Sequence, residues 1–218
     1  MKNAFLKFSV AATMVLLLSG CTGDKAFTQN NQQSGELDRK VKEFLNSKAY
    51  AWRDMNVPAS DGQLLYDIIV KNKYTRALEI GTSTGHSGIW IAWALSKTGG
   101  KLITVEIDER RYKEALANFE KAGLSAYIDA RLADAHTLVP QLEGPFDFIF
   151  SDADKDWYIN YFKAIDPNLV VGGCFTSHNV GQYGGREYYN YVSKLKNYST
   201  TVDNRGAGMS VSYKTAEN

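Results

Sequence analysis

The chain has 218 residues, enough for one α/β domain with a complete hydrophobic core and too few for two domains of ordinary size. Hydrophobic residues make up 44% and charged residues 22% of the sequence, which excludes a disordered protein, and the net charge of +1 provides no bulk attraction for nucleic acid. The two cysteines, Cys21 and Cys174, form no Cys-x-x-Cys pair, which argues against a disulfide framework and a cysteine-ligated zinc site.

The first 21 residues have the pattern of a secretory signal. Lys2 and Lys7 precede an apolar run over residues 10–18, which is too short to span a bilayer as a stable anchor. The run ends in Leu-Ser-Gly-Cys21, which resembles a bacterial lipoprotein signal, in which the cysteine is acylated after cleavage. We therefore predict a signal peptide over residues 1–20 and a lipid on Cys21; the alternative is an ordinary secretion signal with an incidental cysteine.

Residues 22–35 are polar and show no apolar periodicity, which predicts a flexible tether between the lipid and a domain over residues 36–218. The lipid would be the only link to the membrane. It would hold the domain outside the cytoplasm, on the periplasmic side of a bacterial membrane or on the outer membrane.

From residue 36 onward, helical and strand patterns alternate. Such alternation predicts an α/β, Rossmann-like fold with a seven-stranded, mostly parallel sheet and helices on both faces. A short connection between the last two strands predicts a C-terminal antiparallel hairpin. Helices are expected over 36–49, after a capping box at 60–63, from 86 to 95, and over 109–121, 137–142, 157–165 and 187–195; strands are expected over 76–80, 101–107, 126–132, 146–150, 169–176, 198–202 and 208–214.

A glycine loop, Glu79-Ile-Gly-Thr-Ser-Thr-Gly85, follows the first strand, where ligands bind in doubly wound sheets. Its Gly-x-x-x-Gly spacing differs from the Gly-x-Gly-x-x-Gly that cradles a pyrophosphate, which disfavours a nicotinamide-dependent oxidoreductase. Glu106 ends the second strand, at the distance where an acidic side chain accepts the ribose hydroxyls, whereas Asp108 is better placed to cap the next helix. Loop and acid together predict an adenosyl cofactor without phosphate, S-adenosylmethionine.

Four segments together resemble the catechol and caffeoyl-CoA O-methyltransferases and their bacterial relatives: Leu78–Ser87, Glu106, Ala133–His136 and Asp152–Lys155. The resemblance covers nearly the whole domain. It implies a Class I methyltransferase that transfers a methyl group to a hydroxyl of a small, catechol-like acceptor. His136 would lie near the adenine; an exposed helix position is its alternative. The cofactor-binding set expected from this resemblance is Val57, Glu79, Gly81, Ser83, Gly85, Ser87, Glu106, Ala135, His136 and Asp152.

The same resemblance implies that Lys155 is the general base, that Asp152 is a catalytic residue and metal ligand, and that an Asp-Asn pair completes the metal site. The chain departs from the family here, because it has His178-Asn179 in place of that pair. Imidazole is a good ligand for zinc, iron or manganese and a poor one for magnesium. The exchange leaves three alternatives: a different metal, a weakened magnesium site, or a metal-free enzyme with Lys155 and His178 as bases. We favour a divalent metal (Mg, Mn or Zn) on Asp152, His178 and Asn179, the alternative being that His178 only packs at a strand end.

The segment Val180–Arg186 is rich in glycine and bordered by tyrosines, which favours a mobile lid over a flat acceptor, with Trp157 and Tyr183 lining an aromatic pocket. A rival function is a non-catalytic, extracytoplasmic lipoprotein that binds an adenosyl ligand, because S-adenosylmethionine is made in the cytoplasm. The expected partners are a small hydroxyl acceptor and no nucleic acid; a homodimer is an assembly that the sequence leaves open.

Overall fold

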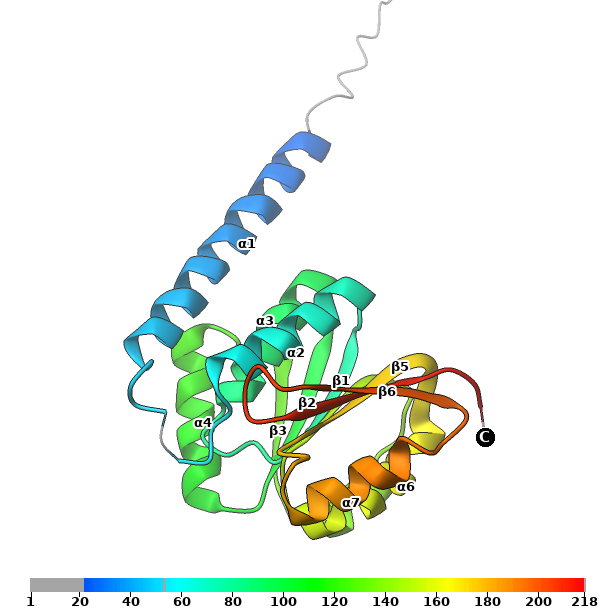
Figure 1. Ribbon diagram of the computed structural model, residues 1–218. Coiled ribbons are helices and arrows are strands. Elements are labelled where there is room, and N and C mark those ends of the chain that lie inside the picture. Colours follow the sequence, from blue (N-terminus) through cyan, green and yellow to red (C-terminus); the bar gives the residue numbers. More distant parts are fainter. Residues whose placement is uncertain (1–21, 53, 218) are drawn as a thin grey trace, which may run out of the picture. The chain divides into compact units, whose positions relative to one another are not determined.

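The computed structural model describes residues 22–52 and 54–217 (Figure 1). The chain divides into a unit of residues 1–35 and a compact unit of residues 36–218. Among the described residues, no helix combines the length and apolar character needed to cross a membrane. The predicted signal peptide and the predicted acylation site at Cys21 lie outside the described residues.

The compact unit is built on one seven-stranded sheet with the strand order β3-β2-β1-β4-β5-β7-β6. Strands β1 to β5 are parallel, and β7 pairs antiparallel with both β5 and β6, as the sequence predicts. Because β2 and β4 flank β1, their carboxyl ends meet at one edge of the sheet. The strands are β1 (Arg76–Ile80), β2 (Lys101–Glu106), β3 (Ile128–Leu132), β4 (Phe146–Ser151), β5 (Leu169–His178), β6 (Tyr198–Asp203) and β7 (Met209–Lys214).

Helices cover both faces of this sheet: α2, α3 and α4 lie on one side, and α6 and α7 on the other (Figure 1). Each βαβ connection returns the chain to a parallel strand, which explains the layered arrangement. The helices are α2 (Ala59–Asn72), α3 (His86–Thr98), α4 (Glu109–Ala122), α5 (Ala135–Leu138), α6 (Tyr158–Ile165) and α7 (Tyr183–Val192), with 3₁₀ turns at Ser125–Tyr127, Val139–Gln141, Lys155–Trp157 and Asp166–Asn168.

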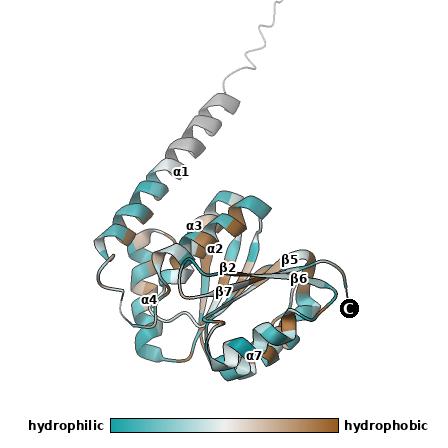
Figure 2. Cartoon of the chain, in the orientation of Figure 1, coloured by the Kyte–Doolittle hydropathy of each residue, from teal (hydrophilic) through white to brown (hydrophobic). Residues whose placement is uncertain are grey.

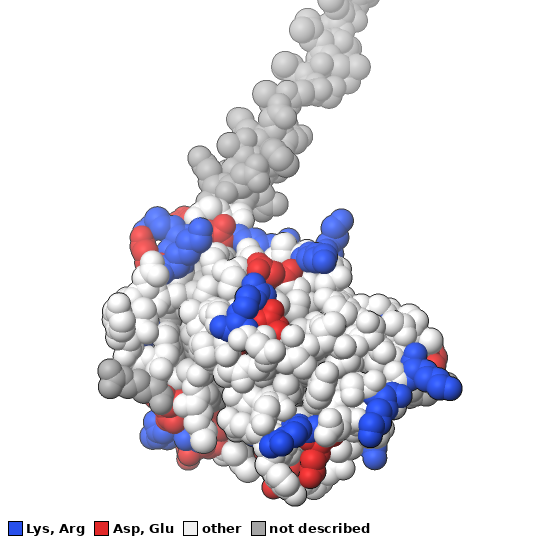
Figure 3. Space-filling view, in the orientation of Figure 1, with Lys and Arg blue, Asp and Glu red and all other residues white. Residues whose placement is uncertain are grey.

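Successive side chains of the central strands enter different cores. On β1, Leu78 and Ile80 pack under α6 and α7, whereas Ala77 faces α2 and α3. Since both faces of the central strands are covered, they contain short continuous apolar runs, such as residues 148–150 of β4. Helices α2 and α7 carry hydrophilic and hydrophobic residues side by side (Figure 2). On the face in Figure 3, basic and acidic side chains occur together in small groups.

Helix α1 (Thr22–Ser47) begins at Thr22, so the expectation of an irregular tether over residues 22–35 is wrong for the backbone of this segment. The stretch contains alanine, lysine and glutamine, which have good helix propensity, and no proline, so the helical pattern that starts at residue 36 continues toward the N-terminus. Val41 and Leu45 of α1 pack against buried residues of α3 and α4.

The predicted capping box at residues 60–63 is also wrong. Helix α2 begins one residue earlier, at Ala59, after Pro58, and no side chain caps it. Pro58 takes the N-cap position, and Gln63 donates to Asp67 Oδ1 at 2.8 Å within the helix instead of turning back to its start. Asp61, also in the first turn, is buried and accepts hydrogen bonds from distant parts of the chain.

The glycine-rich segment after Asn179 differs from the predicted mobile lid, because α7 starts at Tyr183 and includes Gly184 and Gly185 in its first turn. A Cβ atom on Gly184 would overlap the carbonyl group of Lys155, and one on Gly185 would lie 2.6 Å from the carbonyl oxygen of Asn179. The two glycines therefore allow α7 to pack directly on the backbone of two expected site residues.

Candidate active site

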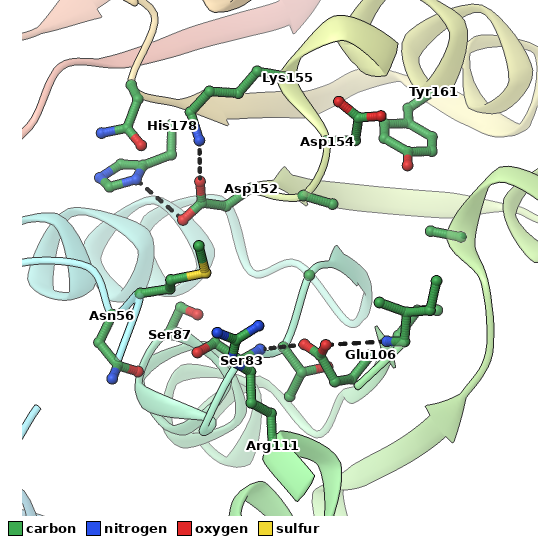
Figure 4. A pocket seen from close by; sticks show the side chains of 18 of the residues that line it. Asn56, Ser83, Ser87, Glu106, Arg111, Asp152, Asp154, Lys155, Tyr161 and His178 are labelled. Atoms are coloured by element: carbon green, nitrogen blue, oxygen red, sulfur yellow. Dashed lines mark hydrogen bonds and ion pairs between the residues drawn. The ribbon is translucent and has the colours of Figure 1, made fainter. Parts of the chain in front are cut away.

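A cavity of about 600 Å³ opens at the carboxyl ends of β1, β2, β4 and β5, within the range of small-molecule sites (Figure 4). The glycine loop and Glu106 border one part of it, and Asp152, Lys155 and His178 border another. The fold thus brings the predicted cofactor loop and the predicted chemical groups into one cavity.

The glycine loop runs through backbone conformations that favour glycine. Gly81 has φ +97°, and a Cβ atom there would lie 2.7 Å from the carbonyl oxygen of Asp152. Gly85 has φ +94°, and a Cβ atom would lie 2.7 Å from the ring of Phe119. The first glycine lets the loop approach the end of β4, and the second lets α3 begin against α4.

Glu106 is fixed by three backbone N–H groups. Its Oε2 accepts the N–H of Ser83 at 2.7 Å, and its Oε1 accepts those of Ile107 at 3.1 Å and Asp108 at 2.9 Å. Each carboxylate oxygen keeps acceptor capacity for a further hydroxyl. Asp108 caps α4 by accepting the N–H of Arg111 at 2.8 Å, which confirms its predicted role.

Residues 54–58, which the sequence analysis did not single out apart from Val57, form a strap beside the loop. The Asp54 carboxylate binds Arg110 at 2.6 Å and Arg111 at 3.0 Å, and these two arginines hold the pKa of Asp54 below its usual value. The Asp54 carbonyl accepts the Ser83 hydroxyl at 2.7 Å. Asn56 lines the cavity and bonds to the Thr84 hydroxyl at 3.0 Å.

The predicted cofactor residues divide into two groups. Three of them, Val57, Glu79 and Gly85, are not among the side chains that border the cavity in the described part of the chain. Val57 is the member of the strap that packs in the core, and its carbonyl oxygen lies 2.9 Å from His86 Nδ1. The other seven line the cavity, namely Gly81, Ser83, Ser87, Glu106, Ala135, His136 and Asp152.

Glu79 is completely buried on β1, behind the cavity wall. Burial raises its pKa to about 8, although the Ser87 and Thr104 side chains oppose the rise. The Thr104 hydroxyl donates to Glu79 Oε2 at 2.6 Å. Glu79 therefore supports the loop from behind.

His136 lies in a cluster of rings and carboxylates at the cavity wall. Its ring stacks on Tyr161 at 5.7 Å between centroids and lies 4.2 Å from that of Trp157. Its nitrogens lie 3.0 Å from Asp134 and 3.3 Å from Asp154. Tyr161 lines the cavity, whereas Tyr183, expected in an aromatic pocket, is 72% exposed.

Asp152 lies at the centre of the part of the cavity that Lys155 and His178 also border, which we call its chemical end. Its Oδ1 lies 3.7 Å from Lys155 Nζ and accepts the Tyr158 hydroxyl at 3.4 Å, and its Oδ2 lies 3.1 Å from His178 Nδ1 (Figure 4). The carboxylate beside Tyr158 adds to the effect of burial, which raises the pKa of that phenol far above its usual value. Lys155 begins a 3₁₀ turn that Asp154 caps.

His178 lies between Asp152 and a residue that sequence reasoning missed, Asp61. Its Nε2 lies 2.8 Å from Asp61 Oδ2. Burial alone would lower the pKa of His178, but the hydrogen bonds and charges of the two carboxylates outweigh burial and raise the pKa to about 9. The alternative that His178 only packs at a strand end therefore does not describe its contacts.

The family resemblance implies a divalent metal at this end of the cavity, where the chain offers few donor groups. The described residues contain no group of three or more His, Cys, Asp and Glu side chains arranged for a metal, so the expected site depends on the amide of Asn179. His178 Nδ1 is buried and lies 3.1 Å from Asp152 Oδ2, the distance of an ion pair between the imidazole and that carboxylate. A nitrogen, a carboxylate and an amide suit manganese or zinc better than magnesium.

Comparisons with known proteins identify the family of this chain. Residues 31–186 match the O-methyltransferase family. Caffeoyl-CoA O-methyltransferase 1 of Eucalyptus globulus is 36% identical over 135 residues, 60% of this chain and 54% of that protein; the catechol O-methyltransferase of Niastella koreensis is 39% identical over 150 residues, 62% and 67% of the two chains. The match therefore spans about half the length of the plant relative.

A solved structure has the same fold. The O-methyltransferase of Bacillus cereus, crystallised in complex with SAH, has a TM-score of 0.71 and 27% identity over 81% of this chain and 91% of that chain. The family match extends over more than half of the sequence and includes the loop, Glu106 and Asp152. The chain therefore belongs to the O-methyltransferase family.

Proposed function

We propose that this protein is an S-adenosylmethionine-dependent O-methyltransferase that acts on a hydroxyl of a small, catechol-like aromatic acceptor. The observation that carries the proposal is the single cavity that joins a loop and carboxylate suited to an adenosyl group with a lysine–aspartate pair. Bound S-adenosylmethionine would supply a methyl group on a sulfonium sulfur.

At the cofactor end of the cavity, side chains are proposed to bind the cofactor and to orient its adenosyl group. Glu106 is already held by three N–H groups, so its free acceptor positions can take the two ribose hydroxyls without reorganisation. Ile107 is 67% exposed and borders the same cavity, where it offers an apolar surface to a flat base. His136 is proposed to lie at the edge of that base.

At the chemical end, Lys155 is proposed as the general base. It removes the proton of the acceptor hydroxyl while the oxygen forms a bond to the methyl carbon and the carbon–sulfur bond breaks. Lys155 accepts this proton as the neutral amine, and Asp152 Oδ1, 3.7 Å from Nζ, would stabilise the ammonium ion that forms. The packing of α7 on the Lys155 backbone fixes the start of the side chain.

We further propose that Asp152, His178 and Asn179 hold a divalent metal. When bound, it would lower the pKa of the acceptor hydroxyl and help to orient it. A catechol acceptor, which presents two neighbouring hydroxyls, is supported by the catechol O-methyltransferase of Niastella koreensis as a relative and by Tyr161 in the cavity wall.

The proposal is tested with the purified domain, S-adenosylmethionine and a catechol, with and without chelator. Lys155→Met should reduce methyl transfer by a factor of about 10² to 10⁴, the usual contribution of a general base, and leave SAH affinity within twofold. Lys163→Met, which removes an exposed lysine from α6, is the matched control and should keep full activity.

A fully active Lys155→Met variant would remove the base assignment. Binding of SAH without transfer to any catechol, under any metal, would instead support the rival function of a non-catalytic adenosyl-binding lipoprotein.

We also propose that the mature protein is anchored by a lipid on Cys21 and faces away from the cytoplasm. The support is the basic start, the apolar run and the Leu-Ser-Gly-Cys sequence. Labelling cells with radioactive palmitate should mark the wild-type chain and not Cys21→Ser. Label that persists in Cys21→Ser, or a chain that stays in the cytoplasmic fraction, would overturn this assignment.

A further inference from the structure

The strap of residues 54–58 borders the cofactor end of the cavity. Met55, Asn56 and Pro58 line it, and Figure 4 shows Asn56, Ser83 and Arg111 in the same part of the cavity. Met55 is 74% exposed and has a φ of +51°, a backbone conformation that is uncommon for residues other than glycine. Such a conformation persists only where the surrounding contacts hold it, so the strap depends on its contacts with the rest of the chain.

One buried histidine fixes the chain on both sides of Met55. The ring of Trp52 stacks on that of His86 at 4.6 Å between centroids, and the carbonyl oxygen of Val57 lies 2.9 Å from His86 Nδ1. His86 is 4% exposed and begins α3, directly after the glycine loop. These two contacts leave residues 54–56 between fixed points, so this short middle part can move without a change in the fold.

Asp54 holds the middle of the strap through its side chain and its backbone. Its carboxylate accepts Arg110 Nη2 at 2.6 Å and Arg111 Nη2 at 3.0 Å, and both arginines belong to α4. Its carbonyl oxygen accepts the Ser83 hydroxyl at 2.7 Å and the Asn56 amide at 3.0 Å. Asp54 therefore connects the strap to α4 on one side and to the glycine loop on the other.

The ion pairs of Asp54 are open to solvent. The side chains of Asp54 and Arg110 are 36% and 64% exposed, and that of Arg111 is 26% exposed. An isolated exposed pair contributes little to stability, but one carboxylate shared by two arginines forms a network, and salt screens it. The strength of this contact therefore depends on ionic strength, unlike the buried contacts of His86.

We propose that Asp54 is a positioning residue for the cofactor: its pairs with Arg110 and Arg111 hold the strap against the glycine loop, and their release lets SAH leave. This inference rests on the proposed function, because the ligand is the adenosyl product of methyl transfer. It assigns control of SAH release to ion pairs that take no part in the transfer itself.

The test measures the dissociation rate of SAH from the purified, immobilised protein by surface plasmon resonance. SAH has no net charge, so salt acts mainly on the ion pairs of the protein. Dissociation from the wild type should accelerate by about 3- to 10-fold between about 0.05 M and about 0.5 M salt, because screening weakens exposed pairs. Asp54→Asn should accelerate dissociation by about the same factor at low salt, and the variant should respond little to added salt.

Arg110→Gln completes a double-mutant cycle and covers the case in which Asp54→Asn fails to fold. It should accelerate dissociation in the wild type and have no effect in Asp54→Asn, because both changes remove the same contact. Asp54→Glu keeps the carboxylate and should retain the response to salt. Glu114→Gln is the matched control, because it removes a carboxylate that lies 3.6 Å from Arg110 within α4; its dissociation rate should stay within about twofold of the wild type.

Two outcomes would overturn the proposal. One is equal dissociation of SAH from the wild type and Asp54→Asn at low salt; the other is an effect of Arg110→Gln that has the same size with and without Asp54. In either case SAH still binds, so the proposed function is retained and only the role of Asp54 is rejected. A wild-type protein that binds no SAH would instead reject both, so the two failures are distinguishable.

Discussion

At the scale of single residues, the carboxylate of Glu106 combines a charge with a fixed direction. Its two oxygens accept three backbone N–H groups, so an amide at this position would place an NH₂ against at least one N–H donor. Glu106→Gln should therefore raise the Kd for S-adenosylmethionine by about 10- to 100-fold, since hydrogen bonds to a charged group contribute about 1.5–3 kcal/mol. Isothermal titration calorimetry measures the change.

The control for this prediction is Glu109→Gln, which removes an exposed carboxylate from the start of α4 and should leave the Kd unchanged. A Glu106→Gln variant that binds the cofactor within twofold of the wild type, with an unchanged unfolding midpoint, would contradict the ribose assignment.

At the scale of elements, the first turn of α7 controls the position of Lys155. Gly184→Ala would place a methyl group against the Lys155 carbonyl, and either α7 or the 3₁₀ turn must then move. We expect the free energy of unfolding to fall by about 1–3 kcal/mol, the cost of overpacking, and methyl transfer to fall with little change in SAH affinity. Urea unfolding and the transfer assay check the two effects.

Gly181→Ala is the matched control, because no described atom lies within 4 Å of a Cβ atom built on that glycine. Its effect on stability should stay within about 0.5 kcal/mol, as for a surface substitution. Equal stability and activity of the two variants would show that α7 does not position Lys155.

The elements also show which parts of the fold could be predicted from the sequence. Strands such as β4 and the loop after β1 are encoded locally, by apolar runs and by glycines at a strand–helix turn. The contact between Asp61 and His178 joins residues 117 positions apart, and the local sequence around Asp61 favours a capping box that the fold does not form. Gly184 and Gly185 lie in the helix α7, although their segment has the composition of a loop. A sequence does not distinguish a glycine that makes a loop flexible from one that allows close packing.

At the scale of the whole molecule, stability depends on how the folded chain buries ionisable groups that water solvates in the unfolded chain. The sheet is covered on both faces, and its centre contains the completely buried carboxyl group of Glu79, which accepts the hydroxyl of Thr104 on the neighbouring strand. The cavity lies in front of Glu79, and Ser87 connects the two by lining the cavity and bonding to this carboxyl. The protonation state of Glu79 therefore affects both the stability of the fold and the wall of the cofactor cavity.

Glu79 predicts how the stability of the molecule changes with pH. Burial raises its folded-state pKa to about 8 from an ordinary value of 4.5, so between these values the folded chain keeps a proton that the unfolded chain has released. The contribution of Glu79 is therefore fully present below about pH 4.5 and is lost as the pH rises through about 8. Relative to Glu79→Gln, the wild type should lose up to about 1.4 kcal/mol of unfolding free energy per pH unit in this range.

Urea unfolding at pH 5, 6, 7 and 8 measures this difference, and subtraction of the variant cancels the contributions of other groups, His178 included. Glu120→Gln removes a carboxylate from the exposed side of α4 and controls for the loss of one acidic group. If wild type and Glu79→Gln have parallel stability curves from pH 5 to 8, Glu79 is ionised in the folded chain throughout. Hydrogen bonds from the Thr104 and Ser87 side chains would then offset the cost of burying the Glu79 carboxylate, and a charged side chain would lie behind the glycine loop.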